Sequence, residues 1–284
     1  MGTSLILLLL AAAALHAAWN LLLKPVRHRH VLMWGALVVT TAVFLPLLSL
    51  RPPISGVWLL VGTSAVLEAA YYALLVTAYG TGDFSVVYPI ARGTAPALLA
   101  TWSVIFLGER PGAAGLAGLG LIVAGLLTVG GAGTALGRDG LTRPARGTGL
   151  ALLLALLISI YSVVDGAAVK RADPFAYTVV VFALTTLVLT PLVLGRYGGA
   201  VVAGVVRANV GRTIAVGVLQ GLAYMIVLYV YSRAQVSYAG AIREASIVLG
   251  ALAGWLYLGE PFGRVRLAGS LVMFVGIVLI ALAG

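Results

Sequence analysis

The hydropathy of the chain rises and falls in ten runs, and this pattern constrains the fold more than any motif. A run of roughly 20 apolar residues is long enough to cross a bilayer as a helix, which also satisfies its own backbone hydrogen bonds. Such runs lie near 3–23, 31–50, 57–79, 84–107, 113–132, 148–169, 175–195, 212–232, 236–258 and 265–283. The sequence therefore predicts an all-α integral membrane protein with about ten transmembrane helices.

Composition and charge agree with this class. Hydrophobic residues make up 62% of the 284 residues and charged residues only 9%, a balance that suits a bilayer better than a water-soluble core. The net charge of +10 comes mainly from Lys and Arg between the apolar runs, where they contact lipid headgroups. We expect the lipid bilayer as a partner and no nucleic acid, while a monomer and a dimer both stay open.

The chain lacks the sequence features that enzymes, pumps and metal proteins need. It has no Cys and only three His, and it contains no Gly-x-x-x-x-Gly-Lys, His-Glu-x-x-His or Gly-x-Ser-x-Gly motif. We expect no enzyme activity, no catalytic residue, no metal and no cofactor. A membrane enzyme that uses Glu68 and His16, or a channel, is a remote alternative.

A polar stretch divides the ten runs into five and five. Residues 133–146 contain a Gly-Arg-Asp-Gly turn and a Pro, which mark a linker. A shift of 151 residues lays Leu107-Gly108-Glu109 on Leu258-Gly259-Glu260, and Arg92 on Arg243. We interpret 1–132 and 147–284 as two copies of a five-helix repeat. Because five is odd, the copies are inverted in the membrane, and a substrate site is expected near the bilayer midplane where they meet.

Three motifs near helix ends carry a family resemblance: Gly82-Asp83-Phe84-Ser85-Val86-Val87-Tyr88-Pro89-Ile90, Leu107-Gly108-Glu109-Arg110-Pro111 and Leu258-Gly259-Glu260-Pro261. With these motifs the whole chain resembles the ten-helix drug/metabolite transporter superfamily, and within it the EamA-type exporters built from two EamA repeats. A narrower likeness is to bacterial amino-acid exporters, including those for aromatic amino acids.

This resemblance implies a secondary transporter, independent of ATP, that exports small organic metabolites across a bacterial inner membrane by alternating access. Amino acids are the expected substrates. A multidrug carrier, or a carrier of sugar-like or nucleoside-like metabolites with the same fold, is the alternative. The sequence leaves open the direction of transport and whether protons drive it.

Polar side chains inside the apolar runs indicate where the substrate binds, because they are costly in hydrocarbon and so face a bundle interior or a wet cavity. Arg92 and Arg243 stand out, since a permanently charged guanidinium can bind a substrate carboxylate. The candidate substrate-binding residues are polar or aromatic side chains deep in the runs: His16, Trp19, Asn20, Glu68, Tyr72, Tyr79, Tyr88, Arg92, Trp102, Tyr161, Asp165, Tyr224, Tyr238, Arg243 and Glu244.

Several of these residues have a purely structural alternative. Each arginine could instead pair with Glu68, Asp165 or Glu244 and hold the two halves in register. The residues assigned to interfacial aromatic belts, rather than to the site, are Trp34, Trp58, Tyr177 and Tyr197. The two glutamates of the Leu-Gly-Glu motifs, Glu109 and Glu260, are expected to be helix-start and turn features.

Overall fold

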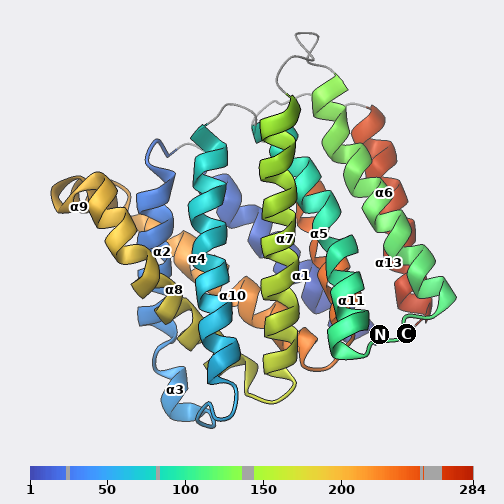
Figure 1. Cartoon of the computed structure of the whole chain (residues 1–284), viewed down its shortest axis with the longest axis horizontal. Helices are drawn as coiled ribbons and strands as arrows, with labels where there is room; N and C mark the ends of the chain where they lie inside the picture. The colour runs from blue at the N-terminus through green and yellow to red at the C-terminus, as the bar shows by residue number, and fades with distance from the viewer. Residues whose placement is uncertain (24–25, 81–83, 136–143, 250–251, 253–263, 284) are drawn as a thin grey trace.

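The computed structural model describes residues 1–23, 26–80, 84–135, 144–249, 252 and 264–283, and the elements in these ranges are helices (Figure 1). They are α1 (Thr3–Leu23), α2 (Arg29–Phe44), α3 (Leu47–Leu50), α4 (Trp58–Gly80), α5 (Phe84–Leu107), α6 (Ala113–Ala135), α7 (Pro144–Val169), α8 (Pro174–Tyr197), α9 (Gly199–Ala208), α10 (Val210–Tyr231), α11 (Val236–Arg243) and α13 (Arg264–Ala283). By length and hydropathy, six apolar stretches in the described helices can each cross a membrane, and shorter apolar helices accompany them. The predicted class, an all-α multi-pass membrane protein, is confirmed.

Two predicted runs are interrupted in the structure. The run 31–50 breaks after Phe44, where Pro46 lacks the backbone N–H that a continuous helix requires. The run 236–258 breaks at Glu244, whose backbone N–H donates to the carbonyl of Ala241 at 3.1 Å in a tighter turn. Residues 245–249 are helical again. This second break places two charged side chains, Arg243 and Glu244, at a discontinuity inside a membrane segment.

The helix α9 was not predicted. The sequence around Arg207 looked like a polar connection, whereas residues Gly199–Ala208 form a short amphipathic helix that buries Val202 against α2 and α8. A short helix with one polar face does not form a long apolar run, so hydropathy did not predict it. In Figure 1, α9 lies at the edge of the molecule opposite to α6 and α13.

Helices from the two predicted repeats are interleaved. The first-half helix α1 packs on α10, while the second-half helix α7 packs on both α4 and α5. Likewise α2 contacts α10, and α8 contacts α4. Each of these contacts joins one half of the chain to the other, so the interior of the bundle is shared between the halves.

The helices α6 and α13 approach each other closely through glycine residues. A Cβ atom on Gly118 would lie 2.7 Å from the carbonyl oxygen of Gly276, and one on Gly125 would lie 2.5 Å from that of Gly269. Only glycine allows helices to approach this closely. Adding 151 to Gly118 gives Gly269, and subtracting 151 from Gly276 gives Gly125, so the shift that relates the two predicted repeats exchanges these two contacts.

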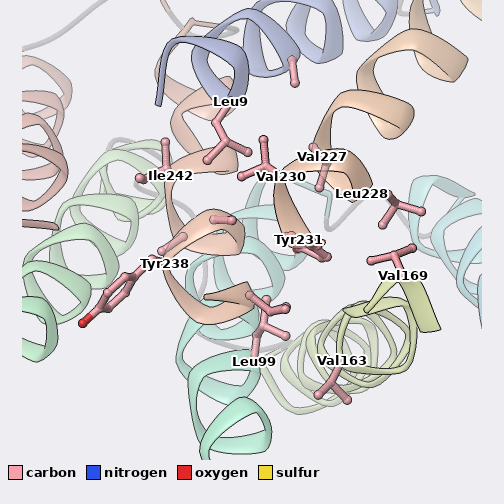
Figure 2. Packing of buried hydrophobic residues seen from close by; sticks show 14 of the residues in the cluster. Leu9, Leu99, Val163, Val169, Val227, Leu228, Val230, Tyr231, Tyr238 and Ile242 are labelled. Carbon is pink, nitrogen blue, oxygen red and sulfur yellow. The ribbon is translucent and has the colours of Figure 1, made fainter. Parts of the chain in front are cut away.

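The largest apolar cluster joins α1, α5, α7, α10 and α11 and is centred on Leu9, Leu99, Leu228 and Tyr231 (Figure 2). Tyr238 lies at its margin, with its ring directed away from the cluster centre. The hydroxyl of Tyr238 sits against α6, where a Cβ on Gly115 would come within 1.8 Å of it. The apolar cluster therefore anchors α11 against its neighbouring helices.

Candidate substrate site

Two adjoining cavities lie among α1, α2, α4, α5, α8 and α10. The outer cavity has a volume of about 340 Å³ and reaches from the middle of α1 and α5 to the end of the bundle where α2 begins and α8 ends. The inner cavity, of about 60 Å³, continues toward α7, α10 and α11. Both share the same five wall residues, which makes them one continuous hollow: His16, Trp19, Tyr71, Tyr72 and Arg92.

A cluster of charged side chains stands at the junction of the two cavities. Nη1 of Arg92 lies 3.2 Å from Oε1 of Glu244, and Nη2 of Arg243 lies 3.3 Å from the same oxygen. The exposed fractions of these residues are 5%, 8% and 1% for Arg92, Arg243 and Glu244. Two buried guanidinium groups therefore share one carboxylate oxygen, and one of them, Arg92, lines both cavities.

His16 extends this cluster onto α1. Its Nε2 lies 2.7 Å from Nη2 of Arg92. Since a guanidinium only donates hydrogen bonds, His16 accepts through Nε2 and is the neutral tautomer with the proton on Nδ1. The side chain of Asn20 donates to the carbonyl of His16 at 2.8 Å, and the ring of Trp19 packs edge-on against the imidazole with centroids 4.8 Å apart. The predicted face of α1 is thus present and lines the hollow.

Asp165 lies behind the wall and orients it. Its Oδ1 accepts from the hydroxyls of Ser64 at 2.5 Å and Tyr177 at 2.8 Å, while Oδ2 accepts from the hydroxyl of Tyr224. Asp165 is fully buried, so these three donors replace its hydration. The consequence is a fixed position for Tyr224, which lines the inner cavity together with Phe182, whose ring centroid is 4.9 Å away.

The inner cavity is amphipathic. Glu68 reaches it from α4 with an exposed fraction of 3%, and its Oε2 has no hydrogen-bond partner within the described part of the chain. Tyrosine rings surround this carboxyl: Tyr71 packs on Tyr72 and Tyr161 with centroids 5.4 Å and 5.9 Å apart. The hydroxyl of Tyr72 accepts from the side-chain amide of Gln220 at 2.6 Å. Such walls suit a solute with both apolar and charged parts.

The structure thus brings together most of the predicted site residues. Those that line the hollow are His16, Trp19, Asn20, Glu68, Tyr72, Arg92, Tyr161, Tyr224 and Arg243. Asp165 and Glu244 hold wall residues from behind. Trp102 instead donates to the hydroxyl of Ser159 at 3.1 Å, and Tyr238 packs against α6. The side chains of Tyr79 and Tyr88 lie outside the described residues.

Sequence reasoning missed the outer part of the hollow. Trp34 and Tyr197, assigned above to interfacial belts, both line the outer cavity, as do Arg29, His30 and Arg196. Position near a span end suggested a lipid contact, and only the three-dimensional packing of α2 against α8 shows that these faces turn inward. Tyr177, assigned to the same belt, is fully buried, whereas Trp58 is 57% exposed as a belt residue should be.

Glu109 has a role that its sequence position did not reveal. Its carboxylate accepts from the backbone N–H groups of Val236 and Ser237, the latter at 3.1 Å, and from the Ser237 hydroxyl at 2.5 Å. These are the free N–H groups at the start of α11, so a residue from the first half caps a helix of the second. The sequence analysis singled out Glu109 as a motif residue. It did not predict the cap, because the start of α11 lies far from Glu109 in the sequence.

Comparison with known proteins bears on the second half of the chain. Residues 145–282 match the model of the EamA-like transporter family. This half is an EamA-like transporter domain. The match is consistent with the resemblance to the drug/metabolite transporter superfamily stated above, and together with the apolar helices it supports a multi-pass membrane protein.

A solved structure shows the same fold over almost the whole length of the chain. One described as "Crystal structure of protein" superposes with a TM-score of 0.82 at 20% identity, covering 99% of this chain and 98% of that one. No curated protein matches the chain in sequence. The EamA-like domain contributes Tyr161, Tyr224 and Arg243 to the hollow, and the preceding half contributes Arg92 and Glu68, so the site is built where the two halves meet.

Proposed function

We propose that the protein is a secondary carrier that exports small carboxylate-bearing metabolites, amino acids foremost, across the bacterial inner membrane. The observation that carries the proposal is the position of Arg92 on the wall of both cavities, beside a carboxylate that it shares with Arg243. A planar guanidinium in a site of low dielectric binds carboxylates with two parallel hydrogen bonds. Arg92 is therefore the substrate contact, and Arg243, which lines only the inner cavity, positions Glu244.

Glu68 supplies the complementary charge. Within the described residues it makes no ion pair, its Oε2 is buried without a hydrogen-bond partner, and the residue lines the inner cavity that Arg92 also lines. An α-amino group would satisfy this oxygen while the α-carboxylate binds Arg92. The tyrosine rings between them provide apolar contact for a side chain of moderate size.

Alternating access follows from the division into 1–132 and 147–284, which is part of this proposal. The interleaved packing of the halves and the exchange of the Gly118–Gly276 and Gly125–Gly269 contacts support it. A two-fold relation of inverted repeats makes a state open at one face nearly equivalent to a state open at the other. In the present state the hollow reaches the exposed Arg196 at one end of the bundle.

At the opposite end of the bundle, Nη1 of Arg51 lies 3.7 Å from Oδ2 of Asp173, and its guanidinium stacks 4.5 Å from the ring centroid of Phe175. These contacts join the end of α3 to the start of α8. They would have to separate for a passage to form there, which assigns them to the closed face of the carrier.

Counterflow in proteoliposomes tests the proposal directly. Vesicles loaded with one unlabelled amino acid should accumulate the same radiolabelled amino acid, with saturation. Arg92→Ala and Glu68→Gln should abolish most of this uptake, whereas Trp58→Ala, a lipid-facing control, should retain it. Uptake that never saturates would indicate a channel, and movement of cationic dyes without any amino acid would refute the substrate assignment.

A further inference from the structure

The outer cavity carries a second feature that carboxylate binding at Arg92 does not require. At its far end, where α2 begins and α8 ends, the wall is formed by Arg29, His30, Arg196 and Tyr197. The deep end of the same cavity is bounded by His16 and Arg92. Cationic or ionisable basic side chains thus stand at both ends, and among the residues described for this wall none is acidic.

The basic side chains at this end are organised around Tyr197. Nδ1 of His30 and the Tyr197 hydroxyl form a hydrogen bond, and the guanidinium of Arg196 lies 5.7 Å from the centre of the same ring. Trp34 stands next to them and is held by a 3.0 Å hydrogen bond from its indole N–H to the Thr190 hydroxyl. Tyr197 therefore holds His30 and lies beside Arg196 at the mouth of the cavity, and Trp34 is fixed next to them.

We propose that this end of the hollow is an anion-binding subsite, formed by Arg29 and Arg196, that receives the carboxylate of the cargo before it reaches Arg92. The inference rests on the proposed function and narrows it, because it restricts the cargo to molecules with an anionic group and excludes net cations such as cationic dyes. A cavity with walls of low dielectric and one sign of charge raises the local concentration of counter-ions and speeds their entry.

The size of the effect can be estimated. One unit charge about 7 Å away in water changes the local concentration of a monovalent ion roughly threefold, and the direction is opposite for anions and cations. Two arginines therefore favour anions over cations by more than an order of magnitude at low ionic strength. Added salt reduces the preference, because the groups reach solvent at the mouth.

Trp34 offers a readout that needs no knowledge of the cargo. We would measure quenching of its fluorescence in purified protein by iodide, by caesium and by neutral acrylamide. The measurement uses a variant that keeps Trp34 and carries Phe at the other four Trp positions. If this variant does not stay monodisperse, the difference in quenching between the parent protein and Trp34→Phe gives the quenching of Trp34.

We expect iodide to quench Trp34 several times more strongly than caesium. The double variant Arg29→Gln, Arg196→Gln should weaken iodide quenching at least threefold and leave acrylamide quenching unchanged. The matched control is Arg207→Gln, Arg212→Gln, which removes the same charge from exposed positions at the same end of the bundle and should change neither. Equal quenching by iodide and caesium, or an unchanged response of the double variant, overturns the proposal.

Two further comparisons complete the test. The first distinguishes an anionic cargo from an anionic lipid headgroup, and the second distinguishes failure of the anion subsite from failure of the amino-acid proposal. If phosphatidylglycerol in the vesicles abolishes iodide quenching while phosphatidylcholine does not, the subsite belongs to a lipid headgroup and our assignment to cargo is wrong. If quenching behaves as expected but no amino acid shows counterflow, the anion subsite stands and the amino-acid proposal falls. If amino acids show counterflow but iodide quenches no better than caesium, the amino-acid proposal stands and the anion subsite falls.

Discussion

Replacing Arg92 or Arg243 by glutamine separates substrate binding from structural support. Either change leaves Glu244 with one guanidinium, at 3.2 Å or 3.3 Å, so the two variants lose a similar buried contact. A hydrogen bond to a charged group is worth about 1.5–3 kcal/mol, and the thermal stability of both variants in detergent should fall by a comparable amount.

The two variants should differ in transport. Arg92→Gln also removes the group that faces the outer cavity, and losing a charge-assisted bond of about 1.5–3 kcal/mol to the cargo raises the KM for counterflow by roughly 10- to 150-fold. Arg243→Gln should change KM much less, since Arg243 lines only the inner cavity. Arg92→Lys should lie between wild type and Arg92→Gln, because an ammonium keeps the charge and loses the planar fork.

The assay is initial-rate counterflow in proteoliposomes over a range of substrate concentrations, paired with thermal unfolding of the same preparations. The two variants lose the same kind of contact to Glu244, and Arg92→Gln also loses the hydrogen bond to Nε2 of His16. The paired unfolding measurement therefore shows whether a difference in stability accompanies the difference in KM. If Arg243→Gln raises KM as much as Arg92→Gln, or if the larger rise belongs to Arg243→Gln, the assignment of the substrate contact is wrong.

Three other variants test contacts that hold the site. Asp165→Ala should lower transport at every substrate concentration by releasing Tyr224, and Tyr224→Phe, which removes the same hydrogen bond, should reproduce part of that loss in counterflow; an active Asp165→Ala would contradict the positioning role. Glu109→Ala removes the cap of α11 and should lower stability by about 0.5–2 kcal/mol in thermal unfolding, with Glu109→Asp partly restoring it. Gly118→Val places side-chain atoms against the Gly276 carbonyl and should yield little monodisperse protein in size-exclusion chromatography, whereas Gly120→Val, at a position with open space around it, should be tolerated.

Hydropathy predicted the fold to the level of its class because apolar length is a property of each segment alone. The breaks at Pro46 and Glu244 were not predicted, because both lie inside runs whose hydropathy stays high enough for a continuous span. The short amphipathic helix α9 escaped notice because its stability comes from packing on α2 and α8 rather than from hydropathy.

The deep half of the candidate site was predictable for a simple reason. Arg92, Glu68 and His16 carry polar side chains that are unfavourable in hydrocarbon. Such residues inside a membrane span therefore indicate a cavity or a polar partner. The outer half of the site could not be predicted. Arg196, Tyr197 and Trp34 lie near span ends, where residues of these types also commonly contact lipid headgroups. Which of the two surroundings applies depends on the rotation of α2 and α8 about their axes, and hydropathy carries no information about that.

The interleaving of the two halves has a consequence for biosynthesis. Helices α1, α4 and α5 are synthesised before α7 and α10, with which they pack in the folded protein. Buried polar groups such as Glu68 and Arg92 must wait in the membrane, shielded by lipid, water or the insertion machinery, until the last helices arrive. The native packing of the first half therefore forms only after the second half has been made.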